Sequence, residues 1–569
     1  MFIRVKQNKG GTSSVVLIMN IRVPGKKNPV SRVIKNFGAS ANPDEILAFT
    51  KNAQDYKLKL ESRNLSLKPL TISAATDIHS CKSITRGFSD IYGQMFNSTF
   101  LNLNLRPKHF SILRDLTIMR IAEPASKRKT AAVAETFGLD LKLDNIYKMM
   151  DHLDDLLIEQ TKHIIYKKTQ SLLASKSKPG SVDVLFYDLT TIYFETNSQD
   201  IVRDFGFSKD GKHRHVQVML AMIVTHDGLP IGYEIFPGNT HEGHTLIPVL
   251  TKMRDKYEIR NVVLVADSAL MNNINLNELE ELNFKYVISA RIKNINKEIK
   301  DLILDNRDYN ITHEATNKDG EVVDLITSKV IDLDEKKKNT ISNDDESGVS
   351  LDVGILADGN ETKSSGCNKL ICYHSTLRAR KDLNDRLENI EKIEKHLGTT
   401  AKSKLTGILK KSYVKVTQGS KIELDESKIK LAEKFDGFFG IRTNIDDATP
   451  AELLGYYKGL WQIEQSFRIA KNNLEIRPVF HWSVKRIKAH FAICYIALSI
   501  LRFVEFNLKL SGKYLPLEVL HTDLMKMKVV NITTNEGQSY HILEDPPLNL
   551  IPIYQSLGIK WPKRFRHIE

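Results

Sequence analysis

Near the N-terminus, apolar and polar positions alternate in the manner of short β-strands. The apolar run Val15–Met19 and the pair Val33-Ile34 lie in basic sequence. Gly10-Gly11 and Pro24-Gly25 supply the turn residues between them. This pattern predicts a small β-meander. The charged, helix-period pattern over 43–66 predicts a helix after it.

The next hundred residues have the period of helices. Three short patterns with brief connections cover Phe110–Ala122, Ser126–Phe137 and Leu143–Leu156, and Gly138 lies between the second and the third. Two short helices joined by a tight turn, beside the basic cluster Lys127–Lys129, resemble a helix-turn-helix that reads DNA. An ordinary helical bundle has the same spacing, so both interpretations stay open.

A linker-like break, KSKPGS at 176–181, precedes a change to alternating strands and helices. Two helices are predicted at about 244–257 and 275–282, between the later strands. The five predicted strands are Val182–Tyr187, Val216–Val224, Leu229–Phe236, Asn261–Val265 and Phe284–Ala290. A three-strand meander followed by helix, strand, helix and strand is an α/β pattern, and it is the order of an RNase H-like fold.

The pattern changes again after Arg291. The sequence up to about Phe435 is charged, is of low complexity near 335–347, and has the period of an amphipathic helix over 377–397. Strand character returns at 436–445, and 451–508 is helical. Its most apolar part, Phe491–Leu501, is too short to span a bilayer and predicts a buried helix.

These changes predict six segments along the chain. They are a basic β-rich domain (1–75), a helical domain that is a helix-turn-helix candidate (76–178), the first part of an RNase H-like core (179–291), an insertion domain (292–435), the second part of the core (436–510) and a C-terminal subdomain (511–569). At roughly 150 residues per domain, several domains are expected of a chain of 569 residues.

Composition and charge narrow the class of protein. The chain has 82 Lys and Arg against 69 Asp and Glu, and residues 1–70 hold 13 of the former against 4 of the latter. This basic segment is either a phosphate-contacting arm or a solvated face. Four scattered cysteines exclude a disulfide framework, and no targeting or membrane segment stands out. We therefore expect a cytoplasmic protein.

Two carboxylates follow predicted strands. Asp188 comes after the first strand of the α/β segment, and Asp267 comes after the fourth. The ends of strands are where sites are built in α/β sheets, and in an RNase H-like order these two strands are neighbours. The two side chains are therefore expected to converge.

A third carboxylate is expected from a later helix. Tyr457, Trp461, Glu464, Arg468 and Lys471 are spaced four, three, four and three residues apart, so an α-helix would place them on one face. That face carries one acid, two bases and an aromatic pair. A salt-bridged, exposed helix with aromatic edges is the alternative interpretation.

This helix resembles the Y-R-E-K signature of bacterial insertion-sequence DDE transposases of the IS-four superfamily. Tyr457, Glu464 and Lys471 fall in the required register, whereas Leu460 occupies the position of the signature arginine. Other motifs resemble the branch usually numbered sixteen-thirty-four and occur in the same order: YDLTTIYFE (187–195), GFSKDGKHRH (206–215), GLPIGYEIFPGNTHE (228–242), ADSALMN (266–272), WQIEQSFRIAK (461–471) and RPVFHW (477–482). The resemblance covers nearly the whole chain.

The resemblance implies an RNase H-like, retroviral integrase-like core whose catalytic triad is Asp188, Asp267 and Glu464. Two divalent ions, Mg²⁺ or Mn²⁺, would be held by these carboxylates, with Asp188 bridging. The ions would activate water for nicking and then the freed 3′-hydroxyl for joining to target DNA. The Leu460 departure leaves a hairpin step undecided.

The same resemblance implies that Tyr457 and Lys471 hold phosphates of the transposon end. Arg468 is a candidate replacement for the missing arginine. Trp461 either stacks on a flipped base or packs in the core. The implied partners are the double-stranded inverted-repeat ends and target DNA, with at least a dimer in the active complex and no membrane.

A metal-dependent nuclease on the same fold, and a non-catalytic DNA-binding protein, are the alternatives. HEGH (241–244) lacks the spacing of a zinc-protease motif, and no phosphate-binding Walker loop is present.

Overall fold

The computed structural model describes most of the chain. The described residues are 2–8, 10–21, 30–63, 78–175, 184–206, 208, 211, 214–257, 262–267, 273–333, 368–395, 413–416, 422–535 and 537–568. The expected linker at 176–181, the low-complexity stretch at 335–347 and the residues directly after Asp267 lie outside them. The chain divides into two compact units, one of 1–94, 131–140 and 507–569, the other of 95–130 and 141–506.

The first unit contains two small sheets. β1 (Phe2–Gln7), β2 (Ser13–Ile21) and β3 (Val30–Ser40) form an antiparallel meander, and α1 (Pro43–Arg63) packs on it. A second sheet has the order β18-β17-β16-β4. Its strands come from both ends of the chain: β4 (Ile78–Thr85), β16 (Lys528–Thr534), β17 (Ser539–Leu543) and β18 (Phe565–Ile568). The expected C-terminal subdomain is therefore completed by a strand that precedes the helical region. The helices η1 (Ser89–Gly93), η2 (Ala134–Phe137), α17 (Leu517–Met525) and α18 (Leu550–Ser556) also lie in this unit.

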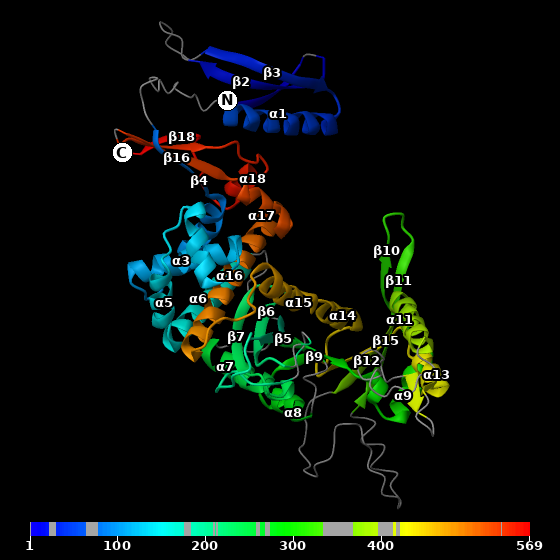
Figure 1. The fold of residues 1–569 in the computed structure, drawn as a ribbon. Coiled ribbons are helices and arrows are strands. Elements are labelled where there is room, and N and C mark those ends of the chain that lie inside the picture. The colour runs from blue at the N-terminus through cyan, green and yellow to red at the C-terminus, as the bar shows by residue number, and fades with distance from the viewer. Residues whose placement is uncertain are drawn as a thin grey trace, which may run out of the picture. The chain divides into compact units, whose positions relative to one another are not determined.

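The second unit is built on a nine-stranded sheet of order β10-β11-β12-β15-β9-β8-β5-β6-β7 (Figure 1). The part from β7 to β9 is an antiparallel meander followed by two parallel strands. Its strands are β5 (Val184–Tyr193), β6 (Gln217–Thr225), β7 (Pro230–Pro237), β8 (Val263–Ala266) and β9 (Lys285–Ala290). This order is consistent with the RNase H-like core that the sequence predicts.

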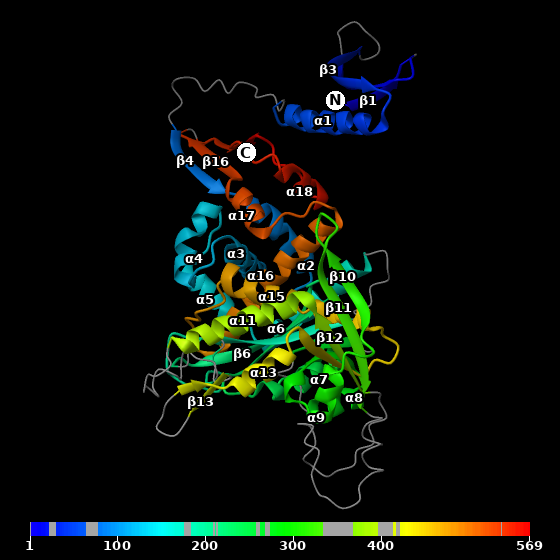
Figure 2. The same ribbon diagram turned by 90° about the vertical axis from the view of Figure 1, so that its right-hand side faces the viewer.

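The strands from the expected insertion domain continue the same sheet (Figure 2). They reach it through β15 (Phe438–Thr443), which pairs with β9 on one side and β12 on the other. The other elements of this region are α9 (Lys297–Leu304), β10 (Asn310–Thr316), β11 (Val322–Asp332), β12 (Lys369–Ser375), α11 (Thr376–Glu394), the short hairpin β13 (Val414–Val416) and β14 (Ile422–Leu424), and α13 (Glu426–Lys434). Its described strands β10–β12 are thus an extension of the core sheet.

The core lies on both faces of this sheet. On one face, alternate residues of β5 (Leu185, Tyr187 and Leu189) pack in a buried cluster with α7 (Leu246–Tyr257) and α8 (Asn273–Glu281). α15 (Trp461–Arg468) packs on β5 and β6. Because side chains alternate along a strand, Phe186 and Asp188 face the side opposite to the α7–α8 cluster.

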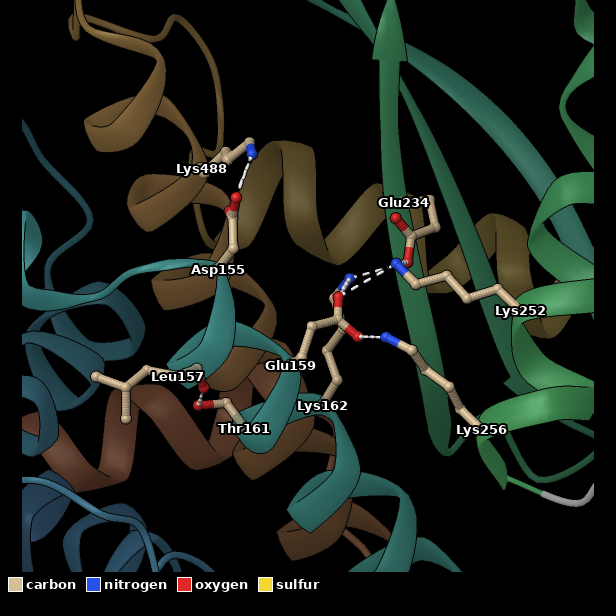
Figure 3. A network of polar contacts seen from close by, with 9 residues as sticks. All are labelled: Asp155, Leu157, Glu159, Thr161, Lys162, Glu234, Lys252, Lys256 and Lys488. Carbon is tan, nitrogen blue, oxygen red and sulfur yellow. Dashed lines mark hydrogen bonds and ion pairs between the residues drawn. The ribbon is translucent and has the colours of Figure 1, made fainter.

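The helical region holds its shape through apolar packing and ion pairs. Its elements in this unit are α2 (Gln94–Thr99), α3 (Pro107–Ala122), α5 (Leu143–His152) and α6 (Asp155–Ala174), and α4 (Lys127–Val133) begins in it. On α6, Glu159 forms ion pairs with Lys162 of the same helix and with Lys252 and Lys256 of α7 (Figure 3). Glu234 of β7 pairs with Lys162 and Lys252. α6 is thereby tied to the edge of the sheet.

The long helix α16 (Val484–Leu510) contains the apolar run 491–501. By length and composition it could cross a membrane, but 94% of its apolar window is buried inside the protein. It is a core helix, as the sequence predicts for this run, although it is far longer than the run itself.

Candidate active site

Asp188 lies within β5, not at its end. The sequence predicts a strand that stops at Tyr187, whereas β5 continues to Tyr193. The β-branched residues Thr190, Thr191 and Ile192 favour this continuation, and all three are buried. Asp188 is half-buried, and its Oδ1 accepts a hydrogen bond from the Leu189 backbone amide at 2.7 Å. The strand therefore fixes the backbone on both sides of this carboxylate.

Asp267 directly follows β8, as predicted, and is exposed. β8 is the parallel neighbour of β5, with Leu185 opposite Leu264 and Phe186 opposite Val265. Asp188 and Asp267 each lie two residues beyond the latter pair. The two aspartates therefore lie just past the same end of this ladder, on neighbouring segments of the chain, and paired strands are about 4.8 Å apart.

Glu464 lies on α15, which packs on β5 and β6. The helix approaches closely because Gly459, just before it, has no side chain: a Cβ there would lie 2.4 Å from Cζ of Phe186. Phe186 shares its strand face with Asp188. Glu464 itself is exposed. The glutamate helix is therefore packed against the strand that carries the first aspartate.

A buried arginine holds the opposite side of this helix. Arg502 of α16 is 2% exposed and donates to Ser466 Oγ (3.0 Å), Gln465 Oε1 (3.3 Å) and the Gln462 carbonyl oxygen (3.5 Å). It also pairs with Glu505 at 2.7 Å. These contacts leave the Glu464 face turned outward.

The expected five-residue face is only partly formed. α14 (Pro450–Lys458), which starts with a capping box of Thr449 and Glu452, ends before Gly459. Tyr457 belongs to α14, whereas Trp461 and Arg468 belong to α15 with Glu464. The prediction of one uninterrupted α-helix is wrong, because the segment is divided at Gly459 and Leu460 and continues as a π-helical turn after Arg468.

The ends of the expected face differ in their surroundings. The ring of Tyr457 is half-buried and stacks on Phe439 of β15, with centroids 6.1 Å apart. Lys471 lies in η7 (Ile469–Asn473), a π-helical turn that rotates it relative to an α-helix. Trp461 is 48% exposed, so it does not pack in the core, and Arg468 is exposed. Trp461, Glu464 and Arg468 are thus the three that share one helix and one exposed side.

The donor chemistry of the three carboxylates suits hard divalent cations, which prefer carboxylate oxygens. Among the residues that the structure describes, however, no group of three His, Cys, Asp or Glu side chains is arranged to hold a metal ion. Asp188, Asp267 and Glu464 therefore share a region of the sheet without forming a closed cluster. Like charges oppose such a cluster unless a cation is bound.

Sequence reasoning missed the two residues that position the glutamate helix. Gly459 is one glycine among 29, and nothing local shows that it faces Phe186. Arg502 had a visible signal, because it is a charged residue at the end of the apolar run 491–501. A cation at such a place, inside a helix, indicates a buried partner.

Comparison with known proteins adds a family match. Residues 180–500 match the family described as "Transposase DDE domain", which is more than half of the 569 residues. No curated protein sequence matches the chain.

Solved structures with which the chain can be aligned include two kinds of transposase complex. The piggyBac transposase synaptic complex with hairpin DNA aligns at 9% identity and a TM-score of 0.34, over 77% of this chain and 76% of that chain. The Mos1 strand transfer complex aligns at 15% identity and a TM-score of 0.15, over 34% of this chain and 63% of that chain.

Proposed function

Because the chain belongs to the transposase DDE-domain family, we propose that it is the transposase of a bacterial insertion sequence of the Y-R-E-K type. In this proposal it binds the inverted-repeat ends of its element, hydrolyses phosphodiester bonds there and joins the 3′ ends to target DNA. Two copies of the chain would pair two ends, in the cytoplasm of the host.

The arrangement of Asp188, Asp267 and Glu464 carries the proposal. Two observations support it: Asp188 and Asp267 lie two residues past the last pair of the β5–β8 ladder, and Gly459, just before the glutamate helix, lies close to Phe186 of β5. These three residues would hold two divalent cations, Mg²⁺ or Mn²⁺, which supply Lewis-acid activation of the attacking oxygen and stabilise the leaving oxygen.

The exposed side of α15 supports a role in DNA contact. Arg468 is one turn from Glu464 and presents a guanidinium that can contact two oxygens of one phosphate. Trp461 presents a half-exposed indole on which a base can stack. Tyr457 and Lys471 would contact the same strand from the neighbouring turns.

The test is cleavage of a DNA fragment that carries the gene's flanking ends, with Mg²⁺ or Mn²⁺ present. Glu464→Gln keeps the size of the side chain and removes its charge. We expect this variant to lose about a thousandfold or more in cutting rate, because a lost metal ligand removes several kcal/mol from the transition state. Binding to the ends, measured by gel shift, should persist.

Asp447→Asn is the matched control, since Asp447 is an exposed carboxylate in the loop before α14. It should cut like the unmodified protein. Equal cutting by Glu464→Gln would remove Glu464 from the site. Cutting without joining to a target DNA would indicate a nuclease, and specific binding with no cutting by any variant would indicate a non-catalytic DNA-binding protein.

A further inference from the structure

Two basic motifs that are far apart in the sequence line one pocket of the second unit. The pocket has a volume of 370 Å³. One wall comes from 125–128, in the AEPASKRK stretch, and another from 475–481, which includes most of RPVFHW. Its volume is at the lower end of the range found for pockets that bind small molecules.

The pocket is strongly cationic. Arg120, Lys127, Arg128 and Arg477 line it, and Glu475 is the one acid among its lining residues. Arg120, at 5% exposure, donates to backbone carbonyl oxygens, including that of Ala125 at 3.0 Å. Among the described residues, Arg120, Lys127 and Arg128 form no ion pair with a carboxylate. By contrast the neighbouring Lys129 pairs with Glu123 at 3.2 Å.

Lys127 is the buried charge of this group. It is 4% exposed, and its Nζ lies 3.4 Å from Nδ1 of His490. His490 Nε2 lies 3.0 Å from the Ile476 carbonyl oxygen, so the ring donates there and offers Nδ1 as an acceptor to Lys127. Burial, and then Arg120, lower the pKa of Lys127 to about 7. A buried ammonium group without an anion is unfavourable, and a bound anion relieves that cost.

An aromatic wall completes the pocket. Phe480 is 59% exposed, and Tyr147 and His481 meet edge to face with centroids 6.4 Å apart. Arg486 lies over the Tyr147 ring at 4.6 Å and is paired with Asp151, so its charge is already balanced. Cations and an exposed aromatic ring side by side are the two features that bind a nucleotide of single-stranded DNA.

We propose that this pocket binds one phosphate of a DNA strand, held by Lys127, Arg128 and Arg477, with the attached base against Phe480. The proposal rests on the proposed function, since it takes DNA as the ligand. It adds a binding site separate from the three carboxylates. The phosphate is either the terminal 5′-phosphate of a strand or an internal one.

The experiment measures fluorescence anisotropy of a labelled single-stranded oligonucleotide in EDTA, so that no cutting contributes. The 5′-phosphorylated oligonucleotide, its 5′-hydroxyl counterpart and inorganic phosphate as competitor are compared. Lys127→Met should weaken oligonucleotide binding about tenfold, as expected for a lost charge-assisted hydrogen bond. The same variant should keep or raise the melting temperature, because it removes a buried charge that has no anion.

Two further variants make the result specific. Lys129→Met removes the same charge two residues away, outside the pocket, and should bind like the unmodified chain. Phe480→Ala should weaken oligonucleotide binding but leave competition by inorganic phosphate unchanged. A preference for the 5′-phosphorylated strand identifies the terminal phosphate, and equal binding identifies an internal one.

Three outcomes would overturn the proposal. Equal losses in the Lys127 and Lys129 variants would indicate diffuse electrostatic attraction. A lowered melting temperature with unchanged binding in Lys127→Met would make Lys127 a structural residue. Inorganic phosphate that binds where oligonucleotides do not would indicate a simple anion site. Because cutting is not measured, these outcomes are independent of whether Glu464 is catalytic.

Discussion

At the scale of single residues, the position of Glu464 depends on the lack of a side chain at Gly459, just before the glutamate helix. Gly459 has φ of −67°, which any residue adopts, so a substitution there acts through space and not through backbone strain. Its absent Cβ makes room for the ring of Phe186, two residues from Asp188. The glutamate helix can therefore lie this close to β5 only because residue 459 has a hydrogen atom in place of a Cβ.

We expect Gly459→Ala to push the helix away from β5. The clash at 2.4 Å with a ring in a packed core should cost about 1–3 kcal/mol of unfolding free energy and lower the cutting rate further than stability alone explains. Gly455→Ala is the matched control, because Gly455 is in α14 and its Cβ would have nothing within 4 Å. That control should gain up to about 1 kcal/mol from helix propensity. Denaturant unfolding and cutting assays measure both effects, and an unchanged cutting rate in the folded Gly459 variant would contradict the argument.

At the scale of elements, ion pairs attach the helix α6 to the sheet (Figure 3). Glu159 pairs with Lys162, Lys252 and Lys256. Burial alone would raise the pKa of Glu159, but the three lysines outweigh it and lower that pKa from 4.5 to about 2. The folded protein therefore holds this carboxylate in its charged form more strongly than the unfolded chain does.

The sign of the pH effect follows from this lowered pKa. The stabilisation is complete above the ordinary value of 4.5 and is lost as the pH falls toward 2. Glu159→Gln should lower the unfolding free energy by about 2 kcal/mol at pH 7, and the difference from the unmodified chain should shrink as the pH falls. Asp155→Asn is the control: its pair with Lys488 is exposed, so its loss should cost less than about 1 kcal/mol. Urea unfolding at several pH values measures both, and a constant difference between pH 7 and pH 3 would contradict the linkage.

At the scale of the whole molecule, local pattern predicts the strands and helices of the core but not all of their pairing. The sequence predicts the strands β5 to β9 from the succession of strands and helices along 184–290, because these elements follow one another in the chain. β4 pairs with β16, from the far end of the chain, and no local pattern marks two such strands as partners. No local pattern marks the pairing of β10–β12 either. Their charged sequence predicts an insertion domain, and the pairing of β12 with β15 makes them part of the core sheet.

In the candidate site too, local sequence predicts some features, whereas others depend on contacts between distant parts of the chain. The sequence predicts Asp188, Asp267 and Glu464 from strand ends and a motif spacing; Asp267 does follow its strand, whereas Asp188 lies inside β5. The close approach of Gly459 to Phe186 and the hydrogen bond from Arg502 to Ser466 exist only in the folded chain, so no local pattern marks them. Periodicity predicts one helix over 457–471, whereas the structure divides this segment among α14, α15 and η7.

The basic excess of the N-terminal region leads to a prediction about salt. Arg4 and Lys6 of β1 and Arg32 of β3 are exposed on one small sheet. If they contact phosphates, each releases counterions on binding, and the slope of log affinity against log salt is about −0.9 per contact. Replacing all three by glutamine should therefore reduce the magnitude of that slope by about 3 for duplex carrying the element ends.

A control with the same change in net charge separates contact from general attraction. Lys381, Lys392 and Lys395 are exposed on or next to α11, and the last two are paired with Glu388 and Glu391. Replacing these three by glutamine should leave the slope unchanged, because charges that contact no phosphate release no counterions from DNA. Filter binding over a range of salt concentrations measures both slopes. Equal slopes for the two triple variants would mean that the basic sheet is a solvated face, whereas a smaller slope for the N-terminal variant alone makes it a phosphate-contacting surface.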